Sequence, residues 1–131
     1  MLLKFDDYPD SCPPKEAVNF EGVFYRLCKG EELCREDFIT HFESGSRFPD
    51  HKLCEAMALS FFDSYDHAEN LKNRYRKFKK YTIKPVEIVK EYGIGILEQQ
   101  NGHLNLWEYR NVDIFAELSK RGENKDEYSN D

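Results

Sequence analysis

Apolar and polar positions alternate from Met57 to Phe62, and a helical period then continues to Lys80. Apolar residues on both sides of the alternating part indicate a strand that is covered on both faces. Ser64 or Asp66 can cap the helix that follows. One apolar stripe runs along that helix at 3.6-residue spacing: Ala68, Leu71, Tyr75 and Phe78. The pattern predicts a strand-to-helix corner at the centre of the fold, with this stripe packed on a sheet.

The remaining apolar segments complete one domain. Short β-branched and aromatic runs predict strands at 23–27, 81–89, 94–97 and 104–109, and helical periods predict helices at 35–42 and 112–121. Pro85 predicts an edge strand, and Asn101 with Gly102 predicts a tight hairpin. We therefore expect an α+β fold: a single compact domain over 22–121, in which a mixed or antiparallel sheet of four to six strands has two or three helices packed on it.

The two ends of the chain differ from this domain in composition. Residues 1–21 are rich in Asp and Pro and predict an extended arm, whereas the acidic residues 122–131 predict a disordered tail. No apolar run is long enough to cross a bilayer, and the first ten residues carry acids where a secretory signal is basic. We expect a soluble, cytoplasmic protein with no membrane partner.

The spacing of the cysteines also favours a cytoplasmic location. The chain has four of them: Cys12, Cys28, Cys34 and Cys54. They include no C-x2-C pair, and without a signal peptide we expect reduced thiols and no metal. A mixed zinc site is one alternative, built from Cys34, His41, His51 and Cys54. A nucleophilic pair of Cys54 with His67 or His103 is another.

A basic segment, residues 72–80, stands out from a chain whose net charge is −6. Its cations are Lys72, Arg74, Arg76, Lys77, Lys79 and Lys80. Clustered cations attract polyanions, and the interleaved Tyr75 and Tyr81 are able to stack on bases, so the segment predicts contacts with phosphate or with an acidic partner. The alternative is a solvated helix end, where cations complement the helix dipole. Because the rest of the chain is acidic, we favour an acidic protein surface or the chain's own tail over nucleic acid.

Three segments suggest an enzyme. Phe24-Tyr25-Arg26 lies on the first strand, Leu59-Ser60-Phe61-Phe62 leads into the central helix, and the later strands are rich in Glu. This order, over residues 20–115, resembles ADP-ribosyltransferases and the related toxin domains that consume NAD. The resemblance implies that Arg26 holds NAD and that Ser60 shapes the nicotinamide pocket. It also implies that one late glutamate stabilises the ribosyl cation: Glu87, Glu98 or, as we prefer, Glu108.

Aromatic residues that lie among charges favour a binding function instead. Such rings anchor protein interfaces when they are exposed. Here they are Phe5, Tyr8, Phe20, Tyr92 and Tyr109. We therefore expect a small protein-interaction module, an accessory or regulatory subunit that needs no cofactor and is not an enzyme. The NAD-dependent enzyme and nucleic-acid binding through 72–80 are the alternatives.

Overall fold

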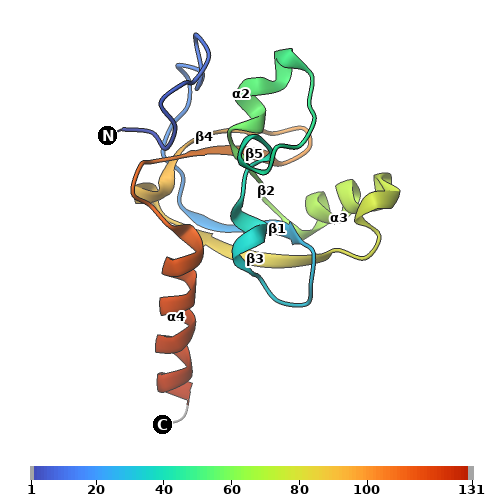
Figure 1. The fold of residues 1–131 in the computed structure, drawn as a ribbon. Coiled ribbons are helices and arrows are strands. Elements are labelled where there is room, and N and C mark those ends of the chain that lie inside the picture. Colours follow the sequence, from blue (N-terminus) through green and yellow to red (C-terminus); the bar gives the residue numbers. More distant parts are fainter. Residues whose placement is uncertain (1, 130–131) are drawn as a thin grey trace.

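The computed structural model describes the backbone of residues 2–129 and the side chains of residues 2–121. Within them the chain forms one domain built on an antiparallel sheet of five strands, in the order β3, β1, β2, β5, β4 (Figure 1). The strands are β1 Gly22–Cys28, β2 Leu59–Phe62, β3 Thr82–Ile88, β4 Gly93–Glu98 and β5 His103–Glu108. The predicted α+β fold is confirmed.

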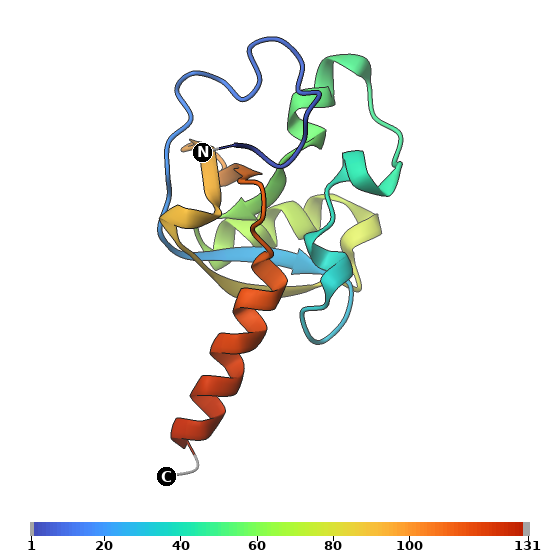
Figure 2. The ribbon, with the colours of Figure 1, turned by 60° about the vertical axis from the view of Figure 1, so that its left-hand side comes forward.

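Short helices connect the strands. In the described residues the α-helices are α1 His41–Ser44, α2 Leu53–Ala56, α3 Tyr65–Arg74 and α4 Ile114–Ser129. The 3₁₀ turns are η1 Arg35–Phe38, η2 Asp50–Lys52, η3 Arg76–Phe78 and η4 Lys90–Tyr92. Because α1 and α2 are single turns, the two long helices are α3, which packs on β1, β2 and β3, and α4, which extends away from the sheet (Figure 2).

Each face of the sheet has its own core. The first face carries a cluster from all five strands or their ends, which η1 and the first turn of α4 cover: Phe24, Phe38, Leu59, Phe61, Val86, Ile88, Tyr92, Leu104, Leu106 and Ile114. On the second face Met57, Ala58 and Trp107 pack against α2 and the N-terminal arm. The described part of the arm contains no helix or strand of its own, and its Leu3 pairs with Tyr109 beyond the end of β5. It therefore closes the second core.

The central corner forms as predicted, but the apolar stripe of its helix is shorter. The Ser64 hydroxyl caps α3 by accepting from the His67 amide at 3.1 Å, and Ala68 is fully buried. The helix ends at Arg74, and Tyr75 has an extended backbone and is 46 % exposed. The prediction that Tyr75 faces the sheet is wrong. Continuing the helix would stack like charges four residues apart, such as Lys72 on Arg76, and such pairs destabilise helices.

The helix predicted at 35–42 is divided in two. Ile39 has an extended backbone and separates η1 from α1. Thr40 then starts α1 with a capping box, in which its hydroxyl accepts from the Glu43 amide and the Glu43 carboxylate accepts from the Thr40 amide. The capping box at Thr40 therefore starts a new helix within the segment whose apolar period predicted one helix over 35–42.

The second half of the sheet confirms the hairpin and the edge strand. β4 and β5 pair around a tight turn in which Gly102 has a φ of 69°. A Cβ on this glycine would lie 2.1 Å from atoms of Asp63 and His67, so the turn also needs a residue without a side chain. β3, which contains Pro85, lies at one edge of the sheet.

The arm is also fixed covalently. Cys12 and Cys54 form a disulfide that joins residues 42 positions apart, so the prediction of reduced thiols is wrong for this pair. Cys28 and Cys34 are free. Sequence spacing could not show the pairing, because the two sulfurs meet only when the arm packs against α2. The disulfide also removes the thiol argument for a cytoplasmic location, and that location stays a prediction.

The C-terminal helix continues past Gly122, where the sequence predicted its end. The disorder predicted for the acidic tail stays a prediction, and residues 130 and 131 lie outside the described part of the chain. In the described part, no helix combines the length and the apolar character that a membrane crossing requires.

Candidate functional site

Arg26 on β1 ties three elements together on the first face of the sheet. Its Nε donates to the carbonyl of Asp37 and its Nη1 to the carbonyl of Ser60, each at 2.5 Å. The guanidinium carbon lies 5.7 Å from the ring centre of Phe38 and 5.4 Å from that of Phe61. Burial lowers the pKa of Arg26 to about 10, so it stays a cation at neutral pH. Holding β1, β2 and η1 together accounts for these contacts.

Ser60 lies on the other face. Both of its neighbours on β2 belong to the cluster around the Arg26 guanidinium, so the alternation of a strand turns Ser60 away from it. Glu108 follows Leu106 of that cluster by two residues and shares the face of Arg26. The three residues that the NAD resemblance implies are therefore divided between two faces of the sheet. The other candidate glutamates, Glu87 and Glu98, are exposed.

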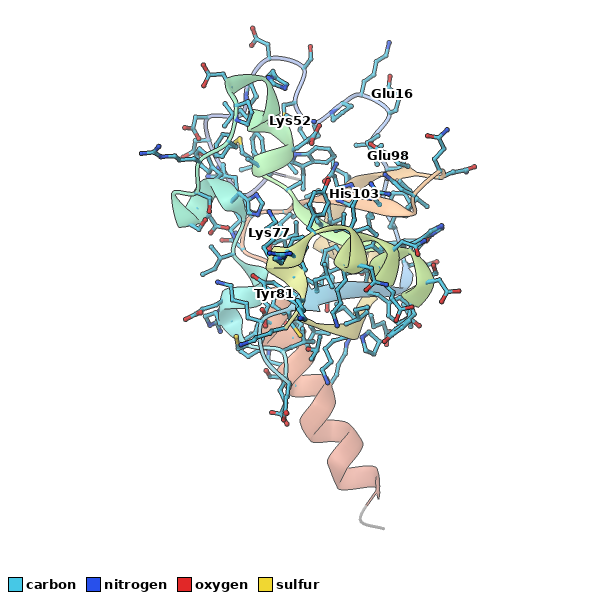
Figure 3. The ribbon with its side chains drawn as sticks, turned by 90° about the vertical axis from the view of Figure 1, so that its right-hand side faces the viewer. Glu16, Lys52, Lys77, Tyr81, Glu98 and His103 are labelled. Carbon is cyan, nitrogen blue, oxygen red and sulfur yellow. A yellow bond between two sulfur atoms is a disulfide. The ribbon has the colours of Figure 1, made fainter. Side chains whose placement is uncertain are left out.

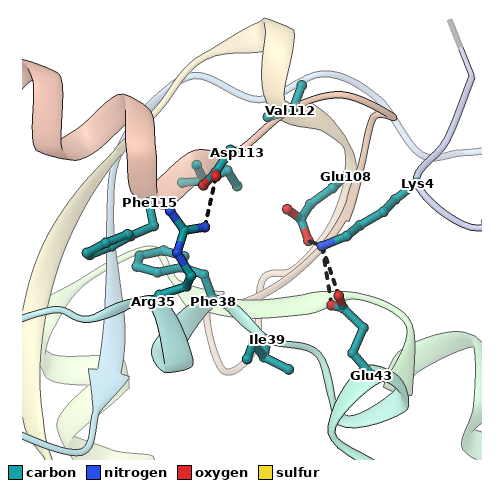
Figure 4. A pocket seen from close by; sticks show the side chains of 10 residues that line it. Lys4, Arg35, Phe38, Ile39, Glu43, Glu108, Val112, Asp113 and Phe115 are labelled. Carbon is teal, nitrogen blue, oxygen red and sulfur yellow. Dashed lines mark hydrogen bonds and ion pairs between the residues drawn. The ribbon is translucent and has the colours of Figure 1, made fainter.

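Glu108 lies at a pocket of about 260 Å³ that opens between the arm, η1, α1 and the start of α4 (Figure 4). Lys4 of the arm reaches into this pocket and contacts two carboxylates, Glu108 at 3.4 Å and Glu43 at 3.2 Å. Across the pocket Arg35 contacts Asp113 at 2.8 Å. We name this the Glu108 pocket. It brings charged residues from both ends of the chain to one place.

The Glu108 carboxyl is unusual because it is only 4 % exposed. Burial raises its pKa to about 7, Lys4 opposes this shift, and Glu43 adds to it. The carboxyl therefore changes charge near neutral pH.

The sequence identified Glu108 but not its partners. Lys4 is 104 residues from Glu108, and Glu43 lies just after the helix that the sequence predicted at 35–42. The contact depends on the backbone of the arm, whose Lys4 amide donates to the Glu108 carbonyl at 2.9 Å. No local pattern indicates such a pairing, because an isolated Lys near a terminus is normally solvated.

Comparisons with known proteins add nothing to this geometry. Models of protein families, curated proteins and solved structures were compared with the chain, and none gives a significant match. The functional argument therefore depends on the Glu108 pocket and on the basic segment.

The basic segment begins on the last turn of α3 and runs through η3 towards β3 (Figure 3). Five of its six cations are exposed, and Lys72 is half-buried. None of the six forms an ion pair with a side chain that the structure describes. Their field reaches neighbouring groups: the pKa of His41 is lowered first by burial and then by Lys77.

Aromatic rings separate these cations. Phe78 lies edge-on to Tyr75 at 6.3 Å and to Tyr81 at 5.0 Å between ring centres. The Lys77 ammonium lies 5.0 Å from the Phe78 ring centre and 6.0 Å from that of Tyr75. The segment is thus an ordered surface on which an exposed tyrosine lies next to cations that have no ion-pair partner among the described side chains.

The mixed zinc site and the nucleophilic Cys-His pair both require a free Cys54 thiol, but the sulfur of Cys54 is bonded to that of Cys12. It can act neither as a thiolate nucleophile nor as a zinc ligand in this state. His67 contacts Asp63 at 2.6 Å. The His103 ring lies 5.3 Å from that of Phe62, tilted by 38°, and burial lowers the pKa of His103. Among the side chains of residues 2–121, no group of three potential ligands is close enough together for a metal ion.

The surface aromatics predicted as interface anchors are instead part of the domain. Tyr92 is buried, Phe20 packs against the first core, and Phe5 and Tyr8 pack against the second. The Tyr109 hydroxyl accepts from Asn19 at 2.9 Å. Sequence reasoning placed them at the surface because charges surround them in the chain, but the fold packs four of these five rings in or against the two cores. Tyr75, predicted to be buried, is exposed instead, as is Tyr65.

Proposed function

We propose that this protein is a binding module whose basic segment takes an acidic segment of another protein. The observation that carries the proposal is the set of six cations without an ion pair among the described residues. Elsewhere in the described chain, Lys4, Arg35 and Arg110 have carboxylate partners. Lys15, Lys29 and Arg47 have none either, but they are isolated, whereas the six cations of the basic segment lie within residues 72–80. Adjacent like charges repel one another, and a partner with negative charge relieves this repulsion.

The composition of the surface supports a protein partner. Tyrosine and arginine are among the residues that contribute most to protein interfaces, and here Tyr75 lies between Arg74 and Arg76. The exposed tyrosine provides apolar contact area, while the cations provide complementarity to carboxylates and speed the encounter.

Overall charge argues against nucleic acid as the partner. The chain carries 25 acidic and 19 basic residues, so the basic segment is a small patch on an acidic molecule. An extended polyanion would meet repulsion beyond this patch, whereas a short acidic peptide would contact the patch alone.

The test measures binding of a fluorescein-labelled peptide of alternating Glu and Leu residues, and of a labelled single-stranded oligonucleotide with the same net charge. We expect the peptide to bind more tightly, and the triple variant Arg74→Ala, Arg76→Ala, Lys77→Ala to weaken peptide binding about tenfold. The matched control replaces three exposed cations elsewhere: Lys15→Ala, Lys29→Ala and Arg47→Ala.

Equal weakening by the two triple variants would show attraction to net charge alone and would overturn the proposal. Tighter binding of the oligonucleotide would assign the segment to nucleic acid instead. A third arm removes residues 122–131 with their four acids. Binding that appears only after this truncation would show that the tail is the natural occupant of the segment, which also contradicts a partner in trans.

A further inference from the structure

The Glu108 pocket has an uneven charge balance. Three carboxylates line it, and Asp113 has its own cation in Arg35. The other two, Glu108 and Glu43, share the single ammonium of Lys4. When both glutamates are ionised, they have one ion-pair partner between them. The Arg26 guanidinium also favours the ionised form of Glu108, but it donates to backbone carbonyls and forms no ion pair with either glutamate.

We propose that the Glu108 pocket binds a primary alkylammonium group, which adds a second cation beside Glu108 and Glu43. The Lys4 ammonium shows that this chemistry fits, since it already lies between the two carboxylates (Figure 4). Ion pairs in a partly buried pocket are screened less by salt than exposed ones. The site is independent of the basic segment, which attracts the opposite charge.

The walls of the pocket select the rest of the ligand. Apolar side chains line it next to the carboxylates: Phe38, Ile39, Val112, Ile114 and Phe115. Arg35 extends this wall by lying 5.2 Å from the ring centre of Phe115. A volume of about 260 Å³ is small for a drug-sized molecule and suits a short hydrocarbon stem. The chemistry is that of a lysine side chain of a peptide or of a free aliphatic amine.

Binding depends on the charge of Glu108. Four groups face it: Lys4 and Tyr8 from the arm, Glu43 from α1 and Arg26 from β1. An ammonium ligand binds the ionised carboxylate more tightly than the protonated one. The affinity of the pocket for the ligand therefore falls as the pH decreases below 7 and Glu108 takes up a proton.

The test is a calorimetric titration of the full chain with n-butylamine and with n-butanol, which has a similar stem and no charge. We expect the amine to bind and the alcohol to bind at least tenfold more weakly, because a charged hydrogen bond is worth about that factor. Glu108→Gln keeps the shape of the side chain and should weaken amine binding about tenfold. The control Glu98→Gln changes an exposed glutamate of the neighbouring hairpin and should leave it unchanged.

A second variant separates binding from a purely structural role. Lys4→Met leaves both carboxylates without their shared cation, so it should strengthen amine binding about tenfold, whereas a structural ion pair gives no such gain. Amine and alcohol of equal affinity, or an unchanged affinity in Glu108→Gln or Lys4→Met, would overturn the proposal. A further arm compares 1,5-diaminopentane with an acetyl-lysine-amide peptide, and the tighter ligand identifies the source of the ammonium. Loss of acidic-peptide binding by the basic segment leaves all these outcomes unchanged.

Discussion

The interior cations and the cations of the basic segment are held in opposite ways. Arg26 donates to two carbonyls and Lys4 contacts two carboxylates. Arg76 and Lys77 have no described ion-pair partner, although they belong to an ordered turn. Contacts within the fold therefore explain the positions of Arg26 and Lys4, but they do not explain why cations gather in the basic segment. Binding of an acidic partner is therefore better sought at the basic segment than at Arg26 or Lys4, whose charges already have partners in the fold.

The largest expected effect is a difference in the free energy of unfolding between variants of Arg26 and Arg76. Arg26→Met removes both donors from the Asp37 and Ser60 carbonyls and should lower the free energy of unfolding by about 4 kcal/mol, since each buried acceptor left unsatisfied costs about 1–3 kcal/mol. The control Arg76→Met, on the exposed segment, should change it by less than about 0.5 kcal/mol. Urea unfolding measures both values. Similar values for the two variants would remove the distinction between the two groups of cations.

The next effect concerns the pH dependence of stability. The pKa of Glu108 is about 7 in the folded chain and 4.5 is its ordinary value, so between these pH values the folded state binds the extra proton. The free energy of unfolding should therefore fall by about 3 kcal/mol as the pH rises from about 4.5 to about 7, because the stabilising protonation of Glu108 is lost over this range.

Glu108→Gln removes this titrating group, so the variant should gain stability relative to the wild type as the pH rises from 5 to 8. Urea unfolding at several pH values gives the difference curve, and Glu98→Gln is the control. A flat difference curve would mean that Glu108 titrates normally in the folded chain.

Local signals in the sequence predicted the corner and the hairpin, because their determinants lie within a few residues. Ser64 caps α3, and Gly102 makes the turn between β4 and β5. The end of α3 at Arg74 could not be read from the apolar period, which continues to Phe78. We attribute the end of α3 at Arg74 to repulsion between like charges and to the return of the chain to β3.

The candidate sites show the same division. The basic segment is contiguous and was identified from the sequence, whereas its exposed aromatic residue was misplaced. The Glu108 pocket needs Lys4, Glu43 and Glu108 to meet from distant segments, and the Cys12–Cys54 disulfide also joins distant segments. Such contacts depend on the register of the arm, which no periodicity encodes.

A smaller effect is expected at the helix that carries the basic segment. Ser64→Ala removes the cap of α3 and should lower the free energy of unfolding by about 1 kcal/mol, because one amide at the helix start loses its acceptor. Ser119→Ala, in the exposed part of α4, is the control and should cost nothing. Thermal unfolding resolves this difference. No loss in Ser64→Ala would show that α3 does not depend on its cap.

The salt dependence of acidic-peptide binding tests the central claim most directly. At low salt the wild type should bind the peptide about tenfold more tightly than the Arg74→Ala, Arg76→Ala, Lys77→Ala variant. The gap should close near 1 M salt, where screening acts over about 3 Å. Equal affinities of the two proteins at low salt would contradict the claim that the cations of the basic segment form a binding surface.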